Sequence, residues 1–116
     1  AGAFAPTGYS LQHHDPGAER RALRRLRGLV PLLAPLGADH AAQGFAGADI
    51  GPLRSAGVPL MGHRTNMEKY FDLHHTAADT VDKVDPGEFA RNVAAMAVMA
   101  YVLAEMPERL DAPDSE

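Results

Sequence analysis

Two adjacent histidines, His74 and His75, are the residues of this chain whose types and spacing could do chemistry. They lie in the segment 70–86, YFDLHHTAADTVDKVDP, which also carries four aspartates. Neutral imidazole is the commonest metal ligand, and a neighbouring carboxylate orients the ring and raises its basicity. Asp79 follows His75 by four residues, so the segment has side chains that can bind a cation.

The histidine pair alone leaves two interpretations open. Adjacent side chains in an extended segment point to opposite faces, so we expect His74 and His75 not to share one ion. A catalytic zinc normally needs three protein ligands, and two histidines hydrogen-bonded in a loop would need no metal at all. The remaining histidines do not have the spacing of a local chelate: His13, His14, His40 and His63.

Length and composition exclude several other kinds of site. The 116 residues fit one domain, or part of a larger one, and 46% of them are hydrophobic. The absence of cysteine excludes disulfides, thiolate zinc sites and cysteine nucleophiles. Residues 1–58 carry six basic and four acidic side chains and residues 59–116 carry five and eleven, which gives the net charge of -4. This balance does not indicate a nucleic-acid-binding surface.

Helix signals dominate the first third of the chain. Asp15 is a candidate N-cap with Pro16 at the first helical position, and an apolar stripe runs on to about Leu33. Pro31 should kink this helix or end it early. Residues 1–14 are expected to form a loop, with at most a short strand at the start. Five arginines predict a solvated helix face, a phosphate- or partner-binding patch being the alternative: Arg20, Arg21, Arg24, Arg25 and Arg27.

The middle of the chain alternates between short strand and helix signals. We expect a strand at 41–45, a short helix from the cap Asp49 through Ser55 that Gly57 closes, and a buried strand at 58–62. This last strand is expected in a mainly parallel sheet, and a polar loop is expected over 62–69. The order of elements indicates the α/β class. His13 and His14 fall in the first loop, His40 past the first helix and His63 at a strand end.

The last helix has the clearest boundaries. Asp85, Pro86 and Glu88 have the spacing of a capping box, in which the acid reaches back to the cap, and Pro107 should stop the helix after Met106. Residues 93–104 are uncharged and too few to span a bilayer, which takes about 20. We expect a sheet on one side of this helix and another helix on a second side, and a frayed acidic tail at 108–116.

The order of three segments resembles a known family. GADIGPLRSAGVP, then YFDLHHTAADTVDKVDP, then a long Ala- and Met-rich helix ending in YVLAEM is similar to the C-terminal part of the di-zinc exopeptidases, which include bacterial leucyl-type aminopeptidases. The chain looks most like their plasma glutamate carboxypeptidase, or carboxypeptidase Q, branch. AGAFAPTGYS resembles the segment that follows a metal-binding aspartate in that branch. The resemblance covers almost the whole chain, and HHT-x-x-DT-x-x-x-x-DP is its specific motif.

The resemblance implies a fold and a set of site residues. The fold is α/β, and residues 1–116 would be the C-terminal portion of a three-layer αβα domain with a mixed, largely parallel sheet. The family's last metal ligand corresponds to His75, Asp79 would be the partner that orients it, and Tyr70 with the 63–70 loop would lie near the substrate cleft. The implied enzyme is a zinc metallopeptidase with two zinc ions, which removes terminal residues of peptides or dipeptides with a metal-activated water.

The resemblance also implies what is missing. The family's other ligands and its catalytic glutamate would precede Ala1, so we expect no catalytic residue within this chain and no hydrolysis by the chain alone. We expect it to need the preceding part of the same domain, to self-associate through an open sheet edge, and to come from a secreted or periplasmic protein. Two other interpretations stay open. One is a non-catalytic interaction domain or ectodomain on the same fold, and the other is an unrelated metal-storage domain built on the six histidines.

Overall fold

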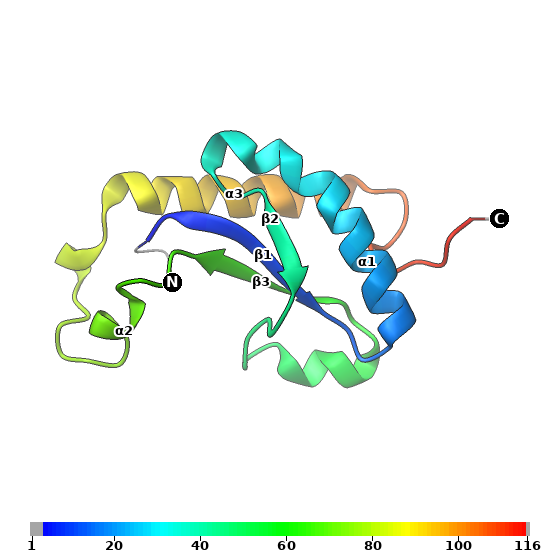
Figure 1. The fold of residues 1–116 in the computed structure, drawn as a ribbon, viewed down its shortest axis with the longest axis horizontal. Helices are drawn as coiled ribbons and strands as arrows, with labels where there is room; N and C mark the ends of the chain where they lie inside the picture. The colour runs from blue at the N-terminus through cyan, green and yellow to red at the C-terminus, as the bar shows by residue number, and fades with distance from the viewer. Residues whose placement is uncertain (1–3, 116) are drawn as a thin grey trace.

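The computed structural model describes residues 4–115 and has the α/β architecture that the sequence predicts (Figure 1). Three strands form one mixed sheet in the order β2-β1-β3, with β1 parallel to β2 and antiparallel to β3. The strands are β1 (Pro6–Gln12), β2 (His40–Gln43) and β3 (Leu60–Thr65). The helices are α1 (Pro16–Leu29), α2 (Tyr70–Leu73) and α3 (Pro86–Glu105), and the 3-10 helices are η1 (Val30–Leu36), η2 (Gly51–Ala56) and η3 (Val81–Lys83).

Strand β1 is the centre of the sheet, although the sequence predicted a loop there. Tyr9 and Leu11 point into the core formed with α1 and α3, while Ser10 points to the other face and donates a hydrogen bond to the carbonyl of Phe45 at 2.9 Å. A strand that is buried on both faces lacks the polar and apolar alternation of a half-exposed strand, so the pattern did not reveal it. Residues 1–3 of the predicted loop lie outside the described residues.

A glycine allows β1 and β2 to approach each other. Gly8 has φ +147°, a conformation that side chains rarely adopt, and it pairs with His40 across the two strands. A Cβ atom at this position would overlap the backbone of His40. The residue is therefore required by the close contact and by its own backbone conformation.

Strand β3 runs antiparallel to β1, which corrects the expected parallel arrangement. It begins at Leu60 and continues to Thr65, so the loop predicted over 62–69 begins only at Asn66. A hydrophobic pattern identifies a strand without giving its direction, which here follows from how the preceding connection turns. In that connection η2 follows Ile50 without a side-chain cap, so Asp49 is not the cap we expected, whereas Gly57 ends η2 with φ +77° as predicted.

Helix α1 confirms the signals at its start and end. The Asp15 carboxylate accepts a hydrogen bond from the backbone N–H of Ala18 at 2.8 Å, and this bond holds the pKa of Asp15 below its usual value. The chain passes from α1 into η1 at Val30, immediately before Pro31. Ala22 and Leu26 of α1 are fully buried and pack in the same core as Leu11.

Helix α3 has the predicted bounds, but one of its faces is exposed. Asp85 caps it by accepting from the N–H of Glu88 at 2.8 Å, and the Glu88 carboxylate binds Arg91 at 3.1 Å instead of turning back to the cap. Ala95 and Met99 pack in the core, whereas another face exposes a row of apolar side chains: Phe89, Val93, Met96 and Tyr101. The sheet and η1 contact α3, in line with the expected sheet and helix neighbours. No described helix covers the exposed apolar side chains. No described helix is long and apolar enough to cross a membrane.

The C-terminal tail is bound to α1, which corrects the expected fraying. Arg20, Arg24 and Arg27 are exposed as expected, whereas Arg21 and Arg25 are half-buried against the tail. Arg25 donates to the carbonyls of Leu110 at 2.9 Å and Ala112 at 2.6 Å. Leu110 is buried, and Asp111 lies 3.1 Å from the Nε2 atom of the buried His13. Backbone carbonyls, which a charge pattern does not show, are the main acceptors for these arginines. Glu116 lies outside the described residues.

Replacing Gly8 by alanine should strongly destabilise the protein. We expect Gly8→Ala to lower the free energy of unfolding by roughly 3 kcal/mol or more, because the strands must separate and the backbone is strained. Gly28→Ala in the last turn of α1 is the matched control, since its Cβ would meet no atom within 4 Å. It should stabilise the protein by about 0.5–1 kcal/mol, as alanine does in helices. Urea unfolding measures both, and equal effects would contradict the explanation.

Neutralising Arg25 should release the tail. We expect Arg25→Gln to lower the free energy of unfolding by about 2 kcal/mol, because hydrogen bonds from a charged donor to partly buried carbonyls are lost. Arg20→Gln on the exposed side of the same helix should change it by less than about 0.5 kcal/mol. Proteolysis of the tail in the two variants gives a second measurement. Similar cleavage rates in both would show that Arg25 does not hold it.

Candidate functional site

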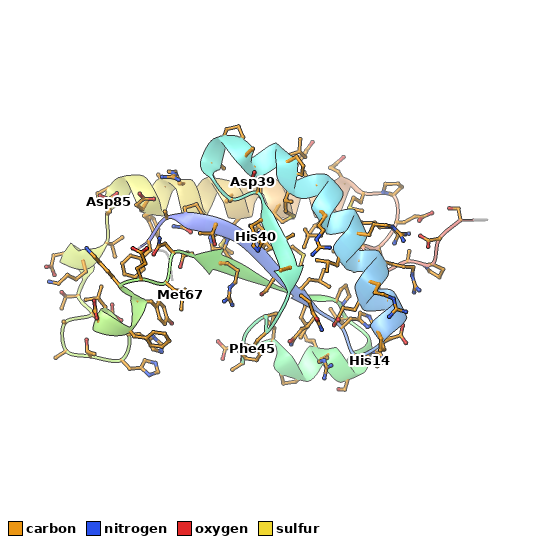
Figure 2. All side chains as sticks on the ribbon, in the orientation of Figure 1. His14, Asp39, His40, Phe45, Met67 and Asp85 are labelled. Atoms are coloured by element: carbon orange, nitrogen blue, oxygen red, sulfur yellow. The ribbon has the colours of Figure 1, made fainter. Side chains whose placement is uncertain are left out.

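The segment that carries His74 and His75 lies at one end of the molecule, beside the first described residues (Figure 1). It connects β3 to α3, and Figure 2 labels Met67 near its start and Asp85 at its end. The backbone N–H of Asn66 donates to the carbonyl of Ala5 at 2.8 Å. This bond attaches the beginning of the segment to the chain just before β1.

Short-range hydrogen bonds shape the segment. The Thr76 hydroxyl donates to the carbonyl of Leu73 at 2.7 Å, which turns the chain directly after α2. Further on, the Thr80 hydroxyl donates to the Asp82 carboxylate, and the ammonium group of Lys83 lies 2.9 Å from the same carboxylate. These bonds lower the pKa of Asp82 to about 2, and the bond from Thr80 has the largest effect. The segment is therefore built from successive turns and not from an extended strand.

The rings of Tyr70, His74 and His75 form a stack. The Tyr70 and His74 ring centroids lie 4.6 Å apart with planes at 24°, and those of His74 and His75 lie 3.7 Å apart at 23°. Phe71 contacts Tyr70 edge to face at 5.2 Å. Sequence reasoning missed this stack, although the spacing of four residues between Tyr70 and His74 places two side chains on one side of a helical turn.

The stack corrects the prediction that His74 and His75 point to opposite faces. That prediction assumed extended backbone, whereas His75 has φ +58° in the left-handed region. The left-handed residue turns the second ring onto the first. His74 is half-buried in the middle of the stack, while His75 is exposed at its end.

Asp79 and Tyr70 occupy different positions relative to His75. The backbone N–H of Asp79 donates to the carbonyl of Thr76 at 3.2 Å, and its side chain is exposed. Among the described residues no hydrogen bond joins the Asp79 carboxylate to His75, so its orienting role stays a prediction. Tyr70 reaches His75 through the ring of His74.

The other histidines have structural partners or lie elsewhere. His13 is buried: its Nε2 atom contacts Asp111 at 3.1 Å, and its Nδ1 atom accepts from the N–H of Asp15 at 2.9 Å. His14 stacks on His13, and His40 is exposed at the start of β2. His63 lies within β3, with its Nε2 atom 2.5 Å from the Oδ1 atom of Asn92. Within residues 4–115, no three histidine, aspartate or glutamate side chains converge on a possible metal position.

A cavity of about 550 Å³ lies beside this segment. Phe4 and Ala5 line it from the start of the described chain, Lys69 and Asp72 from the segment itself, and Glu88 from the first turn of α3. Tyr70 is not among its lining residues, so the predicted loop contributes to the cavity through its earlier part. The cavity holds charged groups of both signs next to apolar side chains.

The donor atoms present fit part of a metal site. The exposed imidazole of His75 makes no hydrogen bond to any described residue, so a ring nitrogen is available to an ion. Zinc in proteins is bound by several nitrogen, oxygen or sulfur ligands, and His75 would be one of them. A complete site would need ligands beyond those that converge in the described residues.

Comparison with known proteins finds relatives over nearly the whole chain. Carboxypeptidase Q of Rattus norvegicus is 36% identical over 110 residues, that of Homo sapiens is 35% identical over 111 residues, and that of Xenopus laevis is 31% identical over 109 residues. These matches cover 94 to 95% of the chain. The chain is carboxypeptidase Q-like.

The carboxypeptidase Q-like chain spans only 22% of the length of these curated relatives. No family model matches it, and no solved structure matches it. The likeness confirms the resemblance seen in the sequence. The α/β class agrees with the structure, which has one small mixed sheet. The three-layer αβα architecture with a largely parallel sheet stays a prediction.

The Thr80 hydroxyl should control the ionisation of Asp82. We expect Thr80→Val to raise the pKa of Asp82 from about 2 toward its ordinary value of 3.8, because the hydrogen bond to the ionised form is lost. Lys83→Gln should also raise it, because the hydrogen bond and the positive charge of Lys83 both lower this pKa. NMR titration of the Asp82 carboxyl carbon measures the shift, and an unchanged pKa in Thr80→Val would show that this turn is not formed in solution.

Proposed function

We propose that this chain contributes one metal ligand and part of the substrate cleft to a zinc-dependent exopeptidase. The observation that carries the proposal is the likeness to carboxypeptidase Q over 95% of the chain, together with an exposed histidine in the HHT segment. The relatives are named as carboxypeptidases, and a peptidase activity of the intact protein agrees with that name. Substrates would be peptides or dipeptides.

In this proposal His75 is the ligand. Its ring lies at the exposed end of the stack, and no hydrogen bond from the described residues occupies its nitrogens. When bound, two zinc ions would activate a water molecule and polarise the scissile carbonyl. Asp79 would orient the imidazole.

The 550 Å³ cavity supports a role in substrate binding. Lys69, Asp72 and Glu88 present both signs of charge around Phe4 and Ala5, which suits a small peptide that carries a free amino group and a free carboxylate. Tyr70, which follows Lys69 in the chain, would lie near this cleft without lining the cavity. The segment 66–85 contains His75 and several residues that line the cavity. This segment would therefore supply both a metal ligand and contacts to the substrate.

The chain would act only within a larger domain. The row Phe89, Val93, Met96 and Tyr101 on α3 is exposed, and a three-stranded sheet has open edges at β2 and β3. Both features support the proposal that further strands and helices of a three-layer αβα domain pack here, and that residues 1–116 alone self-associate and do not hydrolyse peptides. A secreted or periplasmic location is part of the same proposal.

The test uses the intact carboxypeptidase Q-like protein that contains this chain. We expect His75→Ala to lose bound zinc and to lower the rate of dipeptide hydrolysis at least 100-fold, because the ion is no longer held in catalytic geometry. His14→Ala, which removes an exposed histidine between β1 and α1, is the matched control and should keep both.

Elemental analysis and a dipeptide assay on the same samples measure the two quantities. Equal zinc content and equal rates in His75→Ala and the unmodified protein would contradict the proposal. An intact protein without zinc would favour an interaction domain on the same fold.

A further inference from the structure

His75 is held in an unusual backbone conformation. With φ +58° it is the one non-glycine residue of positive φ within residues 4–115. Side chains with a Cβ atom disfavour this region because the Cβ approaches the following carbonyl oxygen. Such strain persists where the surroundings stabilise it, and it is concentrated at functional sites.

The ring of His75 contacts the ring of His74, which in turn contacts the ring of Tyr70. Tyr70 stacks on His74 at 4.6 Å and His74 stacks on His75 at 3.7 Å, with all planes within about 24° of the next. His74 is itself fixed by the last turn of α2, since its N–H donates to the carbonyl of Tyr70 at 2.9 Å. The stack thus connects the helix backbone to the ring of His75.

We propose that Tyr70 and His74 are positioning residues that hold the ring of His75 ready for a metal ion. The inference rests on the proposed function, in which His75 is the ligand. The lone pairs of an imidazole lie in the plane of its ring, whereas stacking uses the face of the ring. His74 can therefore fix the orientation of His75 without competing for the nitrogen that would bind the ion.

The exposure of the rings supports this assignment of roles. His74 has a ring on each side and is half-buried, while His75 has one free face and is exposed. An exposed side chain normally loses rotamer freedom when it binds a ligand. Here the stack has already removed part of that freedom, which raises the affinity for the ion.

The test measures zinc affinity in the intact protein by competition with a chelator. We expect His74→Ala and Tyr70→Ala each to weaken zinc binding about 10-fold, as loss of a residue that orients a ligand does in other metal sites. The matched controls His74→Phe and Tyr70→Phe keep a flat ring and should stay within about twofold of the unmodified protein. The visible spectrum of the cobalt-substituted protein should change in the alanine variants and not in the phenylalanine variants.

Two results would overturn the positioning roles while leaving His75 as the ligand. The first is zinc affinity within twofold of the unmodified protein in both alanine variants, with His75→Ala still losing zinc. The second is an equal loss in His74→Phe and His74→Ala, which would make His74 a ligand through its nitrogen. Unchanged zinc binding in His75→Ala would instead overturn the proposed function, and the positioning roles with it. Unfolding midpoints of all variants check that the fold is retained.

Discussion

The position of β1 at the centre of the sheet is the constraint on which the rest of the structure depends. It pairs with both neighbouring strands, and its side chains are buried on both faces. Gly8 permits the close approach to β2, while Tyr9 and Leu11 pack against α1 and α3. Strand β1 pairs with two strands and is packed on both faces of the sheet. A change in its register would therefore move all of these contacts.

The two ends of β1 connect the core to the two ends of the molecule. Just before the strand, Ala5 accepts the hydrogen bond from Asn66 at the beginning of the histidine segment. Just after it, His13 contacts Asp111 and so fixes the tail that Arg25 also holds. The site segment and the C-terminal tail are therefore attached to the same strand, although they are far apart along the chain.

Polar groups between the sheet and α3 connect this helix to β3 and to the chain just before β1. The Nδ2 atom of Asn92 donates to the carbonyl of Phe4 at 2.7 Å, while its Oδ1 atom faces the Nε2 atom of His63 at 2.5 Å. Beside this pair the hydroxyl of Tyr9 is buried without a hydrogen-bond partner in the described residues, and burial raises the pKa of Tyr9 to about 12. Buried polar groups cost stability when they lose their hydrogen-bond partners. The pairing of Asn92 with His63 and Phe4 therefore favours one position of α3 on the sheet.

The sequence by itself determined the α/β class, the start of α1 at Asp15 and Pro16, the start of α3 at Asp85 and Pro86, and the likeness to carboxypeptidase Q. These are local signals, since a cap bonds within three residues and a motif is read directly. Tertiary structure decided that β1 is a central strand, that β3 is antiparallel, that arginines of α1 bind the tail, and that the rings of His74 and His75 stack. Each of these features depends on a partner distant in sequence or on a residue with left-handed backbone conformation. A local pattern of residue types reveals neither the distant partner nor that conformation.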